Sequence, residues 1–262
     1  MKKRSGTANR TDQILRFLQQ SGSASVEEFC ALLDVSIATV RRDLQELETR
    51  GLLRRTHGGA ATVGPLLYEP FRSDSSFRDQ MERRADEKRR IAIAAADLIQ
   101  DGDTVSLTAG TTTTEVVRSI RHRLDITVVT NTVNVAMELS QRADLKVIVT
   151  GGSLRCNWFS LVGPLAAHAL EQVFPDKLFI GANGVDAEKG LTCHNSDEAA
   201  TNRVMVQHAK KKIAVADHTK FGVVATHRIC GFDDVDLLIT DSGATDEAIA
   251  PFAALGVKVI RA

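Results

Sequence analysis

The chain has 262 residues, of which 33 are Lys or Arg and 33 are Asp or Glu, so its formal net charge is zero. This length allows two domains, and 43% hydrophobic with 25% charged residues is ordinary for a globular protein. The longest apolar runs are far too short to span a bilayer, and no apolar segment follows the basic residues 1–4. We therefore expect no membrane span, no signal peptide and a cytoplasmic location.

Two further features of the composition bear on function. The four cysteines, Cys30, Cys156, Cys193 and Cys230, form no C-x-x-C pair, so we expect no disulfide framework, no metal site and no cofactor. Residues 1–58 hold ten Lys or Arg against seven Asp or Glu, whereas the rest of the chain is slightly acidic. A small basic module joined to an acidic body is typical of a nucleic-acid-binding protein with a separate second function.

Residues 7–62 carry the pattern of a winged helix-turn-helix domain. Apolar residues at helical spacing predict a first helix over residues 11–20, and the capping box of Ser25–Glu28 begins a second. Ser36 is the candidate N-cap of a third helix, which runs to about Glu48. The expected core residues of the second and third helices are Phe29, Leu32, Leu33, Ile37, Val40, Leu44 and Leu47.

A wing follows the third helix and completes a possible DNA-reading surface. Residues 52–55 read as a strand, and Gly58–Gly59 as the turn near the wing. The side chains that can face DNA are polar, small or basic: Ser36, Ala38, Thr39, Arg41 and Arg42 on the helix, and Arg54, Arg55 and His57 on the wing. The guanidinium fork of arginine suits guanine edges and phosphates. The alternative is a solvated basic helix in a three-helix protein-interaction module.

The remainder of the chain has the pattern of a linker and an α/β domain. Residues 63–78, with Gly, Pro and Ser but no sustained period, predict the linker, and residues 79–99 predict one helix. Expected strands are 104–107, 126–130, 146–150, 177–181, 212–216, 237–240 and 257–260, and expected helices are 112–120, 132–141, 164–173, 196–209 and 245–254. Apolar strands that alternate with helices indicate an α/β domain over 79–262, with a mainly parallel sheet covered on both faces.

Four polar loops follow predicted strands, at the sheet edge where α/β proteins bind ligands. They are residues 109–114, Thr130–Asn131, Gly151–Ser153 and Asp217–Phe221. Amides at a helix N-terminus, together with the threonine hydroxyls of the first loop, form an anion cradle, and Lys220 adds a cation. Each loop alone also fits an ordinary turn or cap.

The N-terminal motifs resemble a known family. Val35–Leu44, Leu47–Glu48, Gly51–Leu52 and Arg55–Ala60 closely resemble the signature of the DeoR family of transcriptional regulators, over essentially all of residues 10–60. The resemblance implies that this module binds double-stranded operator DNA. It also implies that Thr39, Arg41 and Arg42 contact bases and phosphates, with Asp43 as a local partner that orients an arginine.

The resemblance continues through the second domain. The matching motifs are Glu87–Ala92, Gly110–Thr113, Thr130–Asn131, Gly151–Gly152 and Asp217–Phe221. It implies a sensor similar to ribose-5-phosphate isomerase and related enzymes, with phosphorylated sugars as inducers. The implied contacts are Gly110, Thr111, Thr112 and Thr113 for the phosphate, and Asn131, Gly151, Glu198 and Lys220 for the sugar.

One segment indicates more closely which class of sugar the effector belongs to. Thr192–Ala199 resembles the branch of the family that regulates N-acetylgalactosamine catabolism, so we expect a homo-oligomeric repressor of a sugar or amino-sugar operon.

The alternative is a sugar-phosphate isomerase or deaminase with an added DNA-binding domain. Such an enzyme needs a base beside the carbonyl carbon. Ile180–Asn183 lacks both acids of the isomerase Asp-Gly-Ala-Asp motif, which argues against catalysis, although Glu198 could still serve as a base.

Overall fold

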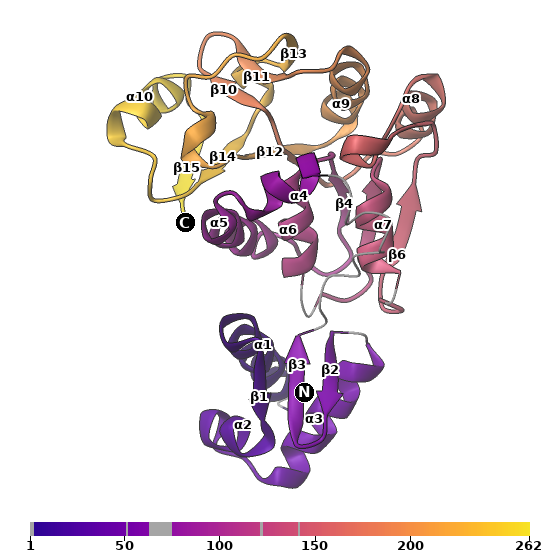
Figure 1. Ribbon diagram of the computed structural model, residues 1–262, viewed down its shortest axis with the longest axis vertical. Coiled ribbons are helices and arrows are strands. Elements are labelled where there is room, and N and C mark those ends of the chain that lie inside the picture. The colour runs from indigo at the N-terminus through magenta and orange to yellow at the C-terminus, as the bar shows by residue number, and fades with distance from the viewer. Residues whose placement is uncertain (1–2, 51, 63–74, 121–122, 141) are drawn as a thin grey trace. The chain divides into compact units, whose positions relative to one another are not determined.

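The computed structural model describes residues 3–50, 52–62, 75–120, 123–140 and 142–262. These residues form two compact units, one mainly from residues up to 62 and the other mainly from residue 75 onward (Figure 1). Most of the expected linker therefore lies outside the described residues. Its last four residues, 75–78, belong instead to a helix of the second unit.

Three helices open the first unit, and two of them begin at side-chain caps. They are α1 (Lys3–Ser21), α2 (Val26–Leu33) and α3 (Ile37–Thr49), so the first helix is longer than the sequence pattern predicts. The predicted capping box is confirmed, because the Glu28 amide donates to Ser25 Oγ at 3.2 Å and the Ser25 amide donates to Glu28 Oε2 at 2.7 Å. Ser36 caps α3 by accepting from the Thr39 amide at 3.4 Å.

The wing is part of a three-stranded antiparallel sheet. Strands β1 (Ser23–Ser25), β2 (Leu53–Thr56) and β3 (Gly59–Thr62) lie in the order β1-β3-β2, and β1 escaped prediction because it is only three residues long. A Cβ at Gly59 would lie 1.9 Å from the Ala24 carbonyl oxygen. Only glycine lets β3 approach β1 this closely, which accounts for the glycine at the start of β3.

The core of the first unit differs at two positions from the expected one. Val40, Leu44 and Leu47 are buried as predicted, but Ile37 is 48% exposed and Leu32 is 42% exposed. Ile37 is the first residue of α3, one turn before the buried face begins, so it projects from the helix start. Helical spacing alone could not separate it from the core.

The second unit is built around a seven-stranded sheet in which every strand pair is parallel. The strands are β4 (Thr104–Leu107), β5 (Thr127–Thr130), β6 (Lys146–Val149), β9 (Lys177–Ile180), β12 (Lys211–Val215), β14 (Leu237–Thr240) and β15 (Lys258–Arg261). Their order is β15-β14-β12-β9-β4-β5-β6. All seven correspond to predicted strands, which confirms the α/β fold class.

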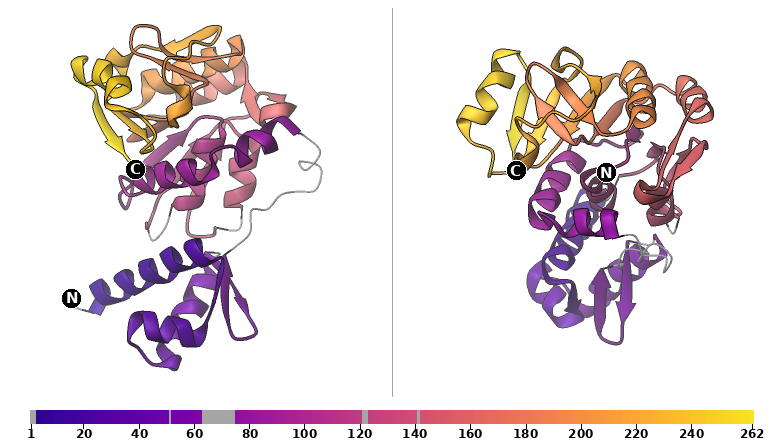
Figure 2. Two further views of the ribbon diagram at one scale, coloured as in Figure 1. Left: turned by 60° about the vertical axis from the view of Figure 1, so that its left-hand side comes forward. Right: turned by 45° about the horizontal axis from the view of Figure 1, so that its top comes forward.

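Helices cover both faces of this sheet (Figures 1 and 2). The described helices of this unit are α4 (Ser75–Glu82), α5 (Ala85–Ala96), α6 (Thr111–Ser119), α7 (Val133–Leu139), α8 (Pro164–Glu171), α9 (Ser196–His208) and α10 (Asp246–Ala254), of which α4 lies against α6 and η2 rather than on the sheet. Successive residues of β9 enter different cores, because Leu178 and Ile180 pack with α9 whereas Phe179 packs with α5 and α6. The helix predicted over 79–99 is wrong as a single element, since it is divided between α4 and α5.

Two smaller sheets were not predicted, because their strands are short. A hairpin pairs β7 (Ser153–Arg155) with β8 (Ser160–Val162), around the 3-10 helix η2 (Cys156–Trp158). A second antiparallel sheet has the order β10-β11-β13, formed by Gly184–Asp186, Gly190–Cys193 and His227–Cys230. Two further 3-10 helices in the described part of the chain are η3 (His218–Lys220) and η4 (Phe232–Asp234).

Candidate functional sites

The N-terminal half of α3 and the wing form one candidate site in the first unit. Arg41 and Arg42 on α3, with Arg54 and His57 on the wing, are all exposed. Arg55 is exposed too, but its guanidinium donates to Gln45 and its amide donates to Glu48 Oε1 at 2.9 Å. These bonds attach the first wing strand to α3. Ser36 and Thr39 hydroxyls are 3.0 Å apart at the helix start.

Asp43 pairs with an arginine, as the resemblance implied, but this partner is Arg10 of α1 and not a nearby arginine of α3. Its carboxylate is 2% exposed and accepts from Arg10 Nε of α1 at 2.9 Å. A buried carboxylate needs such a partner, and this pair ties α1 to α3. Asp43 therefore supports the three-helix framework, while Arg41 and Arg42 of the same helix lie on the solvent side.

A pocket in the second unit lies where the strand order changes direction. Because β4 lies between β5 and β9, the chain proceeds from β4 toward one sheet edge and from β9 toward the other. The loops after these two strands diverge and leave a crevice at their carboxyl ends, the usual ligand position in such sheets. The space there is about 720 Å³, including its open mouth. Its polar lining residues are Gln80, Lys88, Thr111, Thr112, Arg155, Trp158, Asn183, His194, Glu198, Asp217 and Lys220.

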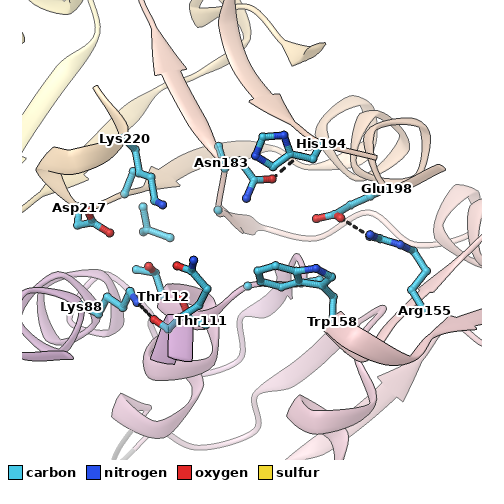
Figure 3. A pocket seen from close by; sticks show the side chains of 17 residues that line it. Lys88, Thr111, Thr112, Arg155, Trp158, Asn183, His194, Glu198, Asp217 and Lys220 are labelled. Atoms are coloured by element: carbon cyan, nitrogen blue, oxygen red, sulfur yellow. Dashed lines mark hydrogen bonds and ion pairs between the residues drawn. The ribbon is translucent and has the colours of Figure 1, made fainter. Parts of the chain in front are cut away.

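One end of the pocket is suited to an anion. Figure 3 shows Lys88 and Lys220 beside Thr111 and Thr112, which begin helix α6. The first helical hydrogen bond of α6 is the Thr114 amide to the Gly110 carbonyl, so the amides before it have no partner within the helix. Free amides and the helix dipole both favour negative charge at this point.

Lys88 is held in place before any ligand arrives. Its side chain is 3% exposed, and its ammonium donates to the Arg83 carbonyl at 2.7 Å and to the Gln80 carbonyl. Burial lowers the pKa of Lys88 to about 8, and the neighbouring Asp217 carboxylate partly opposes this shift. The cation is thus costly to keep in the empty pocket, and an added anion would stabilise it.

The other end of the pocket carries mixed polar groups. Arg155 at the end of β7 donates to Glu198 in the first turn of α9, and the Asn195 side chain caps that helix by accepting from the Glu198 amide at 2.9 Å. Trp158 forms the wall between the two ends, opposite Asn183 (Figure 3). Carboxylate, guanidinium and amide groups can read hydroxyl or amide groups, and an indole face can cover apolar ligand surface.

The structure brings together five of the eight residues predicted to contact an effector. Gly110, Thr111, Thr112, Glu198 and Lys220 line the pocket, whereas Thr113, Asn131 and Gly151 do not. Thr113 Oγ1 points away and donates to the Thr108 and Gly110 carbonyls at 2.8 and 3.0 Å.

Asn131 and Gly151 follow β5 and β6, on the far side of β4 from β9. Asn131 is fully buried, with Nδ2 donating to the Leu161 carbonyl of the β7–β8 hairpin at 3.1 Å. Gly152, next to Gly151, has φ 116°, and a Cβ there would lie 2.7 Å from the Val162 carbonyl oxygen. Gly152 therefore permits close packing of the hairpin, and Gly151, whose φ of 72° is left-handed, permits the turn before it. These needs of the backbone explain a motif that sequence reasoning assigned to the ligand.

Other pocket residues were missed by sequence reasoning. Lys88 lies within a motif noted only for its resemblance, and nothing in the pattern distinguished it from its basic neighbours Arg89 and Arg90. Arg155 and Trp158 belong to the hairpin region that was not predicted. The single tryptophan of the chain was a usable signal, because large aromatic residues are frequent in ligand pockets.

Comparisons with known proteins match both units. Residues 10–65 match the DeoR-like helix-turn-helix domain, and residues 83–242 match the DeoR C-terminal sensor domain. The chain belongs to the DeoR family.

Relatives of this DeoR-family regulator share nearly its whole length. It is 36% identical to a putative aga operon transcriptional repressor of Escherichia coli O157:H7, over 99% of this chain and 95% of the relative. It is 34% identical to the transcriptional regulator GolR of Listeria innocua, over 95% and 96%. Among solved structures, a D-ribose-5-phosphate isomerase in complex with phospho-erythronic acid is 18% identical, with a TM-score of 0.40 over 52% of this chain and 53% of that one.

The relatives confirm a transcriptional regulator rather than an enzyme. Within the described residues, no helix has the length and apolar character of a membrane span. The same residues contain no cluster of three or more His, Cys, Asp or Glu placed to hold a metal.

Proposed function

We propose that this DeoR-family regulator represses a sugar or amino-sugar operon and leaves its operator when a phosphorylated sugar binds the pocket. The observation that carries the proposal is the anion-binding end of the pocket, where Lys88, Lys220 and the start of α6 converge. Phosphate is the ligand group that best matches two ammonium groups and a helix N-terminus. The mixed polar end then reads the sugar.

In this proposal the DNA surface comprises the predicted contacts Ser36, Thr39, Arg41, Arg42, Arg54, Arg55 and His57, and one addition. Ile37 joins them because its side chain is 48% exposed and lies four residues before Arg41, on the same stripe of α3. An exposed apolar side chain on a groove-reading helix suits the methyl group of thymine.

The effector in this proposal is an amino-sugar phosphate. Support comes from the likeness to the aga operon repressor and from the Thr192–Ala199 segment, whose residues His194 and Glu198 line the pocket. Arg155 and Glu198 supply both a donor and an acceptor beside the indole of Trp158. An amide or hydroxyl substituent on the sugar would find both kinds of partner there.

We further propose that the regulator acts as a homodimer or a dimer of dimers in the cytoplasm. One winged helix covers little DNA, and two-fold operators require two-fold proteins. Sedimentation velocity at micromolar concentration should show no dominant monomer. A monomer that binds a single half-site tightly would contradict this assembly.

The effector proposal can be tested through the fluorescence of Trp158, the only tryptophan in the chain and a pocket-lining residue. Purified protein is titrated with N-acetylgalactosamine 6-phosphate, galactosamine 6-phosphate and ketose phosphates, each paired with its unphosphorylated sugar. A saturable change with one phosphorylated member, and release of a fluorescent operator duplex at the same concentration, is expected. A response only to unphosphorylated sugars would contradict the phosphate assignment.

A further inference from the structure

Helix α4 is joined to the pocket through one buried aromatic side chain. A helix of eight residues is too short to be stable alone, so α4 depends on its packing. Phe77 is 8% exposed, and its ring meets the rings of Phe159 and Trp158 edge-on, with centroids 5.1 and 6.3 Å apart. Because Trp158 lines the pocket, Phe77 fixes the position of one pocket wall.

The C-terminal end of α4 is joined to the pocket through Lys88. The last carbonyls of a helix have no partner within it, and here the Gln80 carbonyl of α4 accepts from the Lys88 ammonium, as does the carbonyl of Arg83, the residue after α4. Arg84, between α4 and α5, has a left-handed φ of 54°, which lets the chain turn between the two helices. An ammonium has three N–H groups, so only one remains for a ligand.

The position of α4 in the sequence relates these pocket contacts to the DNA-binding unit. Strand β3 of the first unit ends at Thr62, and α4, which begins at Ser75, is the first described element after it. Gln80 of α4 itself lines the pocket. The segment that leads from the DNA-binding unit therefore continues into the helix that meets the pocket at both the indole wall and the anion-binding end.

We propose that α4 couples the pocket to the DNA-binding unit, a role that rests on the function proposed above. Phe77 is a positioning residue for Trp158, and Lys88 is the group through which a bound phosphate acts on α4. A phosphate that accepts from the remaining N–H of Lys88 competes with the Gln80 and Arg83 carbonyls for the ammonium, so α4 docks differently when phosphate is bound. Operator and effector then oppose each other through the state of this helix.

The experiment measures a coupling factor, the ratio of operator dissociation constants with and without saturating effector. An operator duplex is first selected with the full chain from random DNA, and its release is followed by fluorescence anisotropy. Phe77→Ala is expected to bind this duplex within threefold of the wild type. Its coupling factor should fall about fivefold or more, toward 1. Phe77→Tyr should restore coupling, and the matched control Phe174→Ala, which alters an exposed ring outside α4, should leave it unchanged.

A second readout separates positioning from general stability. In Phe77→Ala with an intact circular dichroism spectrum, Trp158 emission should shift to the red and acrylamide quenching should rise, and Phe77→Tyr should reverse both. Release of operator by Phe77→Ala with the wild-type coupling factor would overturn the role of α4 alone. A wild type that binds operator but responds to no sugar phosphate would refute the proposed function, and the coupling role would fail with it.

Discussion

The proposed DNA-reading surface and the proposed effector pocket are both rich in basic groups, but they hold these groups in opposite ways. Arg41, Arg42 and Arg54 are exposed along a helix and a wing. Lys88 is 3% exposed, and its ammonium already has two carbonyl partners in the empty pocket. Exposed arginines exchange water and counterions for phosphates, whereas buried groups are ordered before the ligand arrives.

The two regions should therefore respond differently to mutation, salt and pH. On a surface of solvated charges, operator affinity should fall in graded steps as charges are removed, and it should depend strongly on salt. In a pocket of buried, hydrogen-bonded groups, effector affinity should fall sharply when a single lining residue is replaced. It should also depend on pH, because the pocket buries a cation at a cost in free energy.

The largest effect is expected from a charge placed in the anion-binding end of the pocket. Thr112 is 8% exposed in the first turn of α6. Thr112→Glu should weaken the effector response more than about 100-fold, because juxtaposed like charges in an interface cost several kcal/mol. Operator affinity should remain within a factor of two. The control Thr226→Glu alters an exposed threonine outside the pocket, and both variants are compared in an operator-release titration. Wild-type release by Thr112→Glu would place the phosphate elsewhere.

A smaller and graded effect is expected on the DNA-reading surface. Arg41→Ala or Arg42→Ala should cost roughly 1–3 kcal/mol of operator binding if the residue makes a bidentate base contact, and should lower the salt dependence if it contacts a phosphate. Arg89→Ala in the second unit removes the same charge from another exposed site and serves as the control. Gel-shift titrations at several salt concentrations measure both quantities. Unchanged affinity in both folded variants would contradict the choice of α3 as the reading helix.

The same contrast explains how far the sequence could predict each site. The proposed DNA-reading surface comes from one continuous stretch, and the caps at Ser25 and Ser36 depend only on neighbouring residues, so local pattern predicted the helices that carry it. Ile37 was the exception, since exposure at a helix start depends on tertiary packing. The pocket combines segments from Gln80 to Lys220, and its position depends on the strand order, which spacing along the chain does not encode.

The strand order explains why some of the predicted effector contacts line the pocket, whereas Asn131 and Gly151 do not. Thr111, Thr112 and Lys220 were found because they follow strands β4 and β12 beside the crevice. Asn131 and Gly151 follow strands of the same parallel sheet, and only the order of those strands shows that they lie on the other side of β4. All seven strands could be predicted because their apolar runs are local features.

Effector affinity is expected to depend on pH through Lys88. The pKa of Lys88 is about 8 in the empty pocket because of burial, with Asp217, Glu115 and Glu87 raising it and Lys220 lowering it. A bound phosphate raises this pKa, so its affinity is greatest below pH 8 and falls as pH rises through that value. A phosphate monoester is already doubly charged above about pH 6, so the titration uses a sugar phosphate without a free amine, whose own charge stays constant between pH 7 and 9.

Effector affinity should therefore be roughly tenfold weaker at pH 9 than at pH 7, the change expected when one proton must be taken up above a pKa near 8. Trp158 fluorescence titrations at each pH measure it. Lys88→Met should bind more weakly throughout and show a nearly flat profile. Operator affinity should change less over this range because arginines stay charged. A flat wild-type profile would mean that the phosphate does not meet Lys88.

The smallest predicted effect concerns the one apolar group on a surface that otherwise reads through charge. If Ile37 contacts a thymine methyl, then replacing that thymine by deoxyuridine removes about one methyl contact, worth about 0.8 kcal/mol or roughly fourfold in affinity. Single deoxyuridine substitutions across the selected operator would locate the position. Ile37→Ala should lose a similar amount of binding affinity on the thymine duplex and almost nothing further on the deoxyuridine duplex, because both changes remove the same contact.

This loss of affinity should also be independent of salt, unlike that of Arg41→Ala, since no counterion is displaced. Additive losses from the two changes at every thymine would show that Ile37 does not read a methyl group, and the surface would then read through polar and charged groups alone.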